Sequence, residues 1–271
     1  MAEAVRRELP AIARAVDHVV EAFRRGGRLF YVGAGTSGRL GTLDASEIPP
    51  TYGTSPEMVQ ALMAGGPKAL VKSVEGAEDS AAQGKKDLAA RGLRSRDVVV
   101  GIASSGSTPY VLGALELAKR RGAWTIGLTS NRKSAIARHV KILIAPETGA
   151  EAIGGSTRMK AGTAHKLALN MLSTTAMVRL GYVYGNFMIN VAQSNEKLKR
   201  RAVKILEQAA GLEARTAAHI MRQAGDDLRV ALVMAKTKED RGRAKSRLAT
   251  AGGNVRLAIE AAASSGRRAK A

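Results

Sequence analysis

The sequence predicts an α/β fold: a three-layer αβα sandwich around a mainly parallel sheet, followed by a helical C-terminal appendage. Short, continuously apolar runs alternate with helical segments over the first 150 residues. This alternation is typical of a parallel sheet that is covered on both faces. After about residue 155 the strand-like runs give way to a series of helical segments.

The first predicted element is an amphipathic helix over residues 9–25, where apolar side chains repeat at helical spacing and Gly26-Gly27 ends the pattern. The segment 56–63 is a weaker strand candidate, because its composition also suits a helix. The four clear strands are the apolar runs at 29–35, 97–104, 123–130 and 140–146. The intervening helices are expected at about 37–46, 66–72, 79–92, 109–121 and 134–138.

A long apolar-rich helix is predicted over residues 157–181. The helices expected after it cover 195–210, 213–225, 226–235, 239–251 and 254–264. We therefore expect two domains, a sheet-containing domain over 1–200 and a small helical domain over 201–271.

Composition excludes several kinds of protein. The chain of 271 residues is 45% hydrophobic and has no cysteine, which rules out disulfides, a thiol nucleophile and Cys-ligated metal sites. Its four histidines are scattered, which makes a His-built metal site unexpected. The N-terminus lacks the apolar run of a secretory signal, and no stretch approaches the roughly 20 apolar residues that cross a bilayer. We expect a cytoplasmic protein without membrane contact.

The net charge of +20 raises the alternative of a nucleic-acid-binding protein. Half of the excess lies between Lys199 and Ala271, where 17 basic residues face 7 acidic ones. No aromatic RNA-reading signature accompanies them. We therefore predict a solvated basic surface and no nucleic-acid partner.

The first candidate loop contains Thr36, Ser37 and Gly38 and matches the spacing GxGxxG between a strand and a helix. Dinucleotide binding is the first alternative, but it requires an acidic residue after the next strand, about 20 residues on. Met63 and Ala64 stand there instead. Two hydroxyls, Thr36 and Ser37, occupy the turn, and at a helix N-terminus they suit a phosphate as well as plain helix capping.

The second candidate loop, residues 104–109, also follows a strand and precedes a helix, with Pro109 suited to the first helical turn. Side-chain hydroxyls, free amide hydrogens and the helix dipole together suit a phosphate. For each loop alone plain helix capping is the favoured explanation. Two such loops on neighbouring strands together favour a phosphate-bearing ligand. The candidate ligand residues here are Ser104, Ser105, Gly106 and Thr108.

A third candidate cluster opens the long helix with Ser156, Thr157 and Lys160, and Glu151 lies just upstream. The bland interpretation is that a hydroxyl caps the helix and the cations face solvent. Cations in a first turn oppose the helix dipole, however, so an anionic ligand explains them better.

Two glutamates differ in their predicted surroundings. Glu47 precedes Pro49-Pro50, which should end its helix, so the dipole would disfavour its charged form and suit a general acid. Glu78 stands at the start of the 79–92 helix, where the dipole favours the anion, although an acidic helix start is a sufficient structural explanation. Two carboxylates with opposed protonation are typical of an acid/base pair.

Long ordered motifs carry a family resemblance. They are GAGTSGRLGTLDASEIPPTYG (33–53), VEGAEDS (74–80), GIASSGSTPYVLGAL (101–115), GGSTRMKAGTAHKLALNMLSTTAMVRLG (154–181) and VYGNFMINVAQSNEKL (183–198). Over nearly the whole chain the sequence resembles the N-acetylmuramic acid 6-phosphate etherases, members of the sugar isomerase (SIS) superfamily.

The resemblance implies a lyase that cleaves the lactyl ether of a sugar phosphate, giving N-acetylglucosamine 6-phosphate and D-lactate in cell-wall sugar recycling. It assigns acid/base catalysis to Glu47 and Glu78, and the dipole argument gives Glu47 the leaving group and Glu78 the proton at C2. No metal or redox cofactor is implied, and a homodimer is expected.

The chain departs from the family pattern at several points. Ser107 stands where arginine is common, His165 where glutamine is common and Ile48 where cysteine is usual. Family members usually carry some tens of residues ahead of the first helix seen here. Two alternatives follow: a non-catalytic sugar-phosphate sensor, as in the related glucokinase regulatory protein, and an aldose–ketose isomerase with Glu151 as its base.

Overall fold

The computed structural model describes residues 1–190 and 195–268, with side chains to residue 264. The chain forms two compact units, one of residues 1–49 and 54–176 and another of residues 50–53 and 177–271. The boundary expected after residue 200 falls inside the helix Glu196–Ala210, whose buried face belongs to the core of the second unit.

The first unit is built on a five-stranded parallel sheet in the order β2-β1-β3-β4-β5. The predicted α/β class is confirmed, and the weaker candidate strand is present as the outermost strand on one side. The strands are β1 (Leu29–Gly33), β2 (Val59–Met63), β3 (Val98–Ile102), β4 (Trp124–Leu128) and β5 (Ile142–Ile144).

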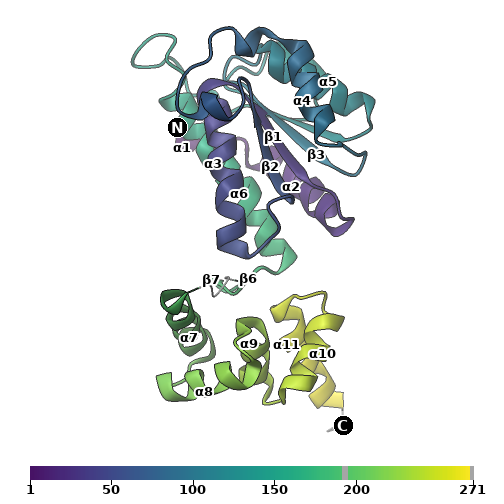
Figure 1. The fold of residues 1–271 in the computed structure, drawn as a ribbon, viewed down its shortest axis with the longest axis vertical. Helices are drawn as coiled ribbons and strands as arrows, with labels where there is room; N and C mark the ends of the chain where they lie inside the picture. Colours follow the sequence, from purple (N-terminus) through teal and green to yellow (C-terminus); the bar gives the residue numbers. More distant parts are fainter. Residues whose placement is uncertain (191–194, 269–271) are drawn as a thin grey trace. The chain divides into compact units, whose positions relative to one another are not determined.

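Helices cover both faces of this sheet (Figure 1). On one face α4 and α5 pack on side chains such as Phe30 and Val99. On the other face Tyr31 reaches α3, and α2 contacts β1, β3 and β5. The helices that begin in this unit are α1 (Ala2–Arg6), α2 (Leu9–Arg24), α3 (Gly35–Tyr52), α4 (Ala81–Ala90), α5 (Pro109–Arg120) and α6 (Lys160–Leu180), with single 3₁₀ turns η1 (Pro67–Leu70), η2 (Ala77–Asp79) and η3 (Ala135–His139). The last residues of α3 and of α6 belong to the second unit.

The second unit consists of helices around a core of alanine, leucine and valine side chains. Asn195, Asp227 and Asp240 each accept an amide hydrogen bond at a helix start, and Gly211 and Gly225 end two helices in the left-handed conformation. A short hairpin, which the sequence analysis did not predict, precedes the helices. The hairpin consists of β6 (Val183–Tyr184) and β7 (Phe187–Met188). The helices that follow it are α7 (Glu196–Ala210), α8 (Ala214–Ala224), α9 (Leu228–Thr237), α10 (Arg241–Thr250) and α11 (Val255–Arg268). Among the described residues, no helix is both long and apolar enough to cross a membrane.

The register of the sheet determines where ligands can bind. Gly33 pairs with both Met63 and Ile102, Ile102 pairs with Leu128, and Leu128 pairs with Ile144. All five strands therefore end at one level, and the loops that follow them lie along the same edge. The chain places β2 on one side of β1 and β3 on the other. Open α/β sheets bind ligands at such a change of side, which here is the crevice between β1 and β3.

Candidate active site

The loop after β1 is built by close backbone approach. A Cβ atom on Gly33 would lie 2.6 Å from the Gly38 nitrogen, and one on Gly38 would lie 2.9 Å from the Gly33 oxygen. These glycines let the first turn of α3 pack against the strand, which places half-buried Thr36 and buried Ser37 at a helix N-terminus. The next strand outward, β2, ends at Met63 and is followed by Ala64, so the strand end itself carries no carboxylate of the kind that a dinucleotide site uses.

Hydrogen bonds from the loop after β4 fix the loop after β3. The Ser104 carbonyl accepts hydrogen bonds from the Ser130 amide and from Thr129 Oγ1, both at 3.1 Å. Gly106 has a φ of +69°, and a Cβ atom there would collide with Ser134. At the front of the loop, exposed Ser105 accepts from the amide and hydroxyl of Ser107.

Thr108 precedes α5 as its N-cap residue without a side-chain capping bond, and Pro109 opens the helix as predicted. Plain capping therefore does not explain Thr108, and its hydroxyl stays available to a ligand. Phosphate binding at this loop stays a prediction.

The third cluster differs from its predicted arrangement. The Glu151 carboxylate accepts the amide hydrogens of Lys160 and Ala161 at 2.9 and 3.0 Å, so Glu151 caps α6. The helix begins at Lys160 for this reason, three residues later than expected, and Ser156 and Thr157 stand before it. The two backbone hydrogen bonds lower the pKa of Glu151, which opposes the isomerase-base alternative.

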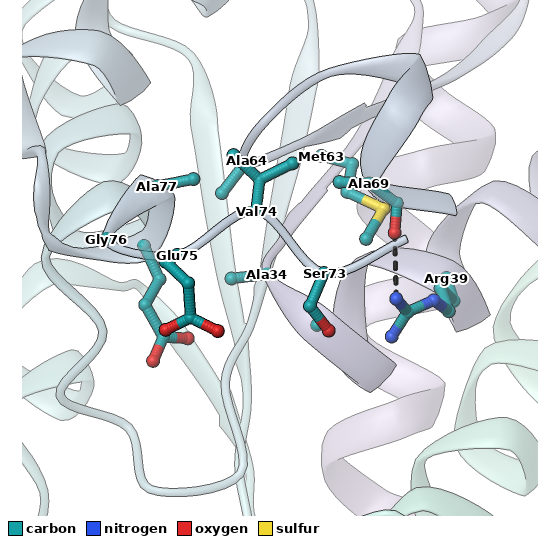
Figure 2. Close-up of a pocket in the computed structure, with 12 residues that line it drawn as sticks. Ala34, Arg39, Met63, Ala64, Ala69, Ser73, Val74, Glu75, Gly76 and Ala77 are labelled. Carbon is teal, nitrogen blue, oxygen red and sulfur yellow. Dashed lines mark hydrogen bonds between the residues drawn. The ribbon is translucent and has the colours of Figure 1, made fainter. Parts of the chain in front are cut away.

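A pocket of about 200 Å³ lies at the carboxyl ends of β1 and β2 (Figure 2). Glu78 lines it from η2, a separate 3₁₀ turn rather than the start of α4. Arg39 donates to the carbonyls of Ala69 and Leu70 and so fixes one wall. Figure 2 also shows Glu75 at this pocket, a carboxylate that our sequence analysis did not select.

Glu47 does not stand at the end of its helix, contrary to the prediction. Pro49-Pro50 do not end the helix, since α3 continues to Tyr52. Buried Ile48 and Tyr52 stabilise the continuation, although the prolines supply no amide hydrogens to the preceding turn. Glu47 therefore lies before the last turn, where the helix dipole has largely decayed, and the premise for its role as the acid is lost.

The structure brings only one of the two glutamates to the pocket. Among the described residues, twelve line it, and Glu47 is not one of them. Glu47 is exposed on α3, two turns beyond Arg39, or roughly 12 Å along the axis at 1.5 Å per residue.

One turn before Glu47, the buried carboxylate of Asp44 was missed by sequence reasoning. It accepts hydrogen bonds from Tyr31 Oη at 2.9 Å and Ser173 Oγ at 3.1 Å, which joins α3 to β1 and to α6. Burial raises the pKa of Asp44, and the two hydroxyls oppose that shift. An aspartate between the apolar residues Leu43 and Ala45 in a predicted helix was the available signal.

Similarity to known proteins first defines the class. Residues 72–175 match the SIS domain family, and residues 11–119 match the glucokinase regulatory protein N-terminal SIS domain. Among solved structures, a putative phosphosugar isomerase involved in capsule formation from Bacteroides fragilis is 22% identical, with a TM-score of 0.51 over 66% of this chain and 84% of that one. Fold and matches together define an SIS-domain protein.

Closer relatives define the family. An N-acetylmuramic acid 6-phosphate etherase from Symbiobacterium thermophilum is 58% identical over 86% of this chain and 77% of the relative. The corresponding etherase 1 from Bacillus licheniformis is 49% identical over 96% of this chain and 85% of the relative, and the Clostridium acetobutylicum etherase is 50% identical over 96% and 86%. The chain belongs to the N-acetylmuramic acid 6-phosphate etherase family, as the motifs indicated.

Proposed function

We propose that the protein is an N-acetylmuramic acid 6-phosphate etherase, a carbon–oxygen lyase that releases D-lactate and N-acetylglucosamine 6-phosphate. The observation that carries the proposal is the 49–58% identity to proteins of that name over 86–96% of the chain. The proposal includes a cytoplasmic location and a role in recycling cell-wall amino sugars.

The substrate phosphate binds at the hydroxyl-bearing loops after β1 and β3. Ser37 and Thr108 stand at helix N-termini on neighbouring strands that end at the same level. Oriented amide hydrogens and helix dipoles favour a dianion there, so phosphate binding needs no metal ion in this scheme.

The reaction is an elimination followed by hydration. The opened sugar presents a C1 aldehyde that acidifies the C2 proton, and Glu78 removes this proton as general base. Glu78 is given the proton at C2 because it lines the pocket, and no longer because of a helix dipole. The electron pair forms the C2–C3 double bond as the C3–O bond breaks, and Glu47, the other glutamate of the family pair, protonates the departing lactate oxygen. Water then adds across the double bond, with hydroxide at C3 and a proton at C2.

The distance of Glu47 from the pocket supports a site completed by a second copy of the chain, because SIS proteins generally build their sites at dimer contacts. In the proposed homodimer, Glu47 of one copy lies against the Glu78 pocket of the other. An equal mixture of refolded Glu47→Gln and Glu78→Gln chains should then recover about a quarter of wild-type activity, since half of the dimers hold one intact site. Absence of recovery, together with a monomeric mass in light scattering, would refute this arrangement.

The test of the function is release of D-lactate from N-acetylmuramic acid 6-phosphate by the purified protein. Glu78→Gln should lower the rate by about 100- to 10,000-fold and suppress exchange of the C2 proton with solvent. Glu47→Gln should block lactate release but leave that exchange. Asp79→Asn, on the same exposed turn as Glu78, is the matched control and should retain activity.

A sugar-phosphate sensor is the second candidate, because residues 11–119 match the glucokinase regulatory protein N-terminal SIS domain. A sensor would bind N-acetylglucosamine 6-phosphate without releasing lactate from the etherase substrate. Near-normal lactate release from both glutamine variants would likewise contradict the catalytic roles.

A further inference from the structure

Ser130, at the carboxyl end of β4, lies directly behind the predicted phosphate loop. Its amide donates to the Ser104 carbonyl at 3.1 Å, and Thr129 Oγ1 donates to the same carbonyl. Ser130 is half-buried and follows β4 at the edge of the sheet where the strands end. The proposed mechanism gives the Ser130 hydroxyl no role.

The partner of Ser130 is His165, in the second turn of α6. His165 Nε2 lies 3.1 Å from Ser130 Oγ, and the imidazole is fully buried. Burial lowers the pKa of His165 to about 4, and a hydrogen bond to the Thr129 backbone opposes this shift more weakly. The imidazole is therefore neutral near pH 7 and carries one hydrogen, on one of its two nitrogens.

The missing partner of the second nitrogen indicates where that hydrogen is. Within residues 1–190 and 195–264, His165 Nδ1 is buried and has no hydrogen-bond partner. A hydrogen on Nδ1 would be an orphaned buried donor, which is rare and costly, whereas a bare Nδ1 leaves only an unfilled acceptor. The favoured tautomer carries its hydrogen on Nε2 and donates it to Ser130 Oγ.

This direction leaves the hydroxyl hydrogen of Ser130 free. The Ser130 oxygen already accepts from His165, and in the described part of the chain its hydroxyl donates to no acceptor. Ser134 in the same loop differs, because its hydroxyl donates to the Asn131 carbonyl at 2.5 Å. Ser130 thus presents an oriented donor beside Ser104, where an anionic ligand supplies the missing acceptor.

We infer that Ser130 is a further ligand-binding residue, whose hydroxyl donates to a phosphate oxygen of the bound sugar phosphate, and that His165 is a positioning residue that sets the direction of this donor. The inference rests on the proposed function for the identity of the ligand. Hydroxyl donation to a phosphate dianion is a charge-assisted hydrogen bond, so it contributes more than a neutral one.

The direct test is calorimetric titration of N-acetylglucosamine 6-phosphate, which needs no turnover. Ser130→Ala should weaken binding about 10- to 100-fold, the range for a lost hydrogen bond to a charged group. Ser130→Thr, which keeps the hydroxyl, should restore most of the affinity. Ser134→Ala is the matched control, because it disturbs the same loop but removes a hydroxyl that is already paired. Equal losses in Ser130→Ala and Ser134→Ala, or unchanged affinity in Ser130→Ala, would overturn the inference.

The positioning role has its own readout. His165→Gln keeps a side-chain donor and should bind within about threefold of wild type, whereas His165→Leu should match the loss seen in Ser130→Ala. In lactate-release assays His165→Leu should raise KM and leave kcat within a few-fold, as expected when binding shared by ground and transition states is lost. A fall in kcat at constant KM would contradict the role. Because the titrations do not depend on lactate release, a protein that binds the ligand but releases no lactate refutes the proposed function and not this inference.

Discussion

Replacing His165 by glutamine should remove a specific part of the pH dependence of stability. The pKa of His165 is about 4 in the folded chain, against 6.5 for an unperturbed histidine side chain. Between these pH values the unfolded chain binds a proton that the folded chain does not, so protonation favours unfolding. The stability contributed by the neutral imidazole is complete above pH 6.5 and is lost as the pH falls toward 4.

The magnitude follows from the two pKa values at 1.36 kcal/mol per pH unit. Between pH 7.5 and 5.0 the wild-type protein should lose about 2 kcal/mol more unfolding free energy than His165→Gln. Glutamine retains a donor for Ser130 but does not titrate, so the difference isolates the imidazole.

The structure supplies the assay. Trp124 is the single tryptophan and stands at the start of β4, so its fluorescence in urea titrations reports the unfolding of the first unit alone. His219→Gln is the control, because His219 is exposed on α8 in the second unit and should leave the wild-type pH dependence intact. If wild type and His165→Gln lose stability in parallel from pH 7.5 to 5.0, a buried neutral His165 is refuted.

Three further predictions concern the sheet, the ligand and the basic surface. Asp97→Ala should lower the free energy of unfolding in urea by about 3–5 kcal/mol, because the fully buried carboxylate accepts hydrogen bonds from the Arg28 guanidinium and from the Arg28 and Arg94 amides. Glu3→Ala, which removes an exposed ion pair on α1, should leave the urea midpoint unchanged. Ser105→Ala should weaken calorimetric binding of N-acetylglucosamine 6-phosphate by about 1–3 kcal/mol, and an unchanged affinity would reduce that hydroxyl to its local turn with Ser107. In a rising salt gradient the protein should elute from heparin before the salt concentration reaches ~200 mM, because scattered basic residues make only contacts that salt screens. Retention at higher salt concentrations would indicate a nucleic-acid-binding surface.

Local sequence patterns were sufficient for the sheet and for its loops. Apolar runs such as 97–104 have no polar alternation because both faces of the strand are covered, so they predict buried parallel strands without knowledge of their neighbours. Once the strands are parallel, their carboxyl ends meet at one edge, and the loops at Thr36 and Ser105 follow as candidate sites. The family motifs then identified Glu47 and Glu78 as the acid/base pair, but they did not give the position of either residue relative to the pocket.

Contacts between distant residues decided what those patterns could not. Pro49-Pro50 have the local signature of a helix end, yet burial of Ile48 and Tyr52 continues α3 through them and changes the position of Glu47 relative to the helix end. The hydroxyls before α6 have the signature of caps, but Glu151 caps that helix instead.

The same reason applies to Asp44 and His165. Asp44 bonds to Ser173, 129 residues away, and His165 to Ser130, 35 residues away. Local propensity describes a residue and its near neighbours, whereas the cost of burying a polar group is offset by whichever partner the fold brings to it. The strands and their loops were therefore determined by the sequence alone, while the hydrogen bonds that orient the side chains behind those loops were decided only by the tertiary structure.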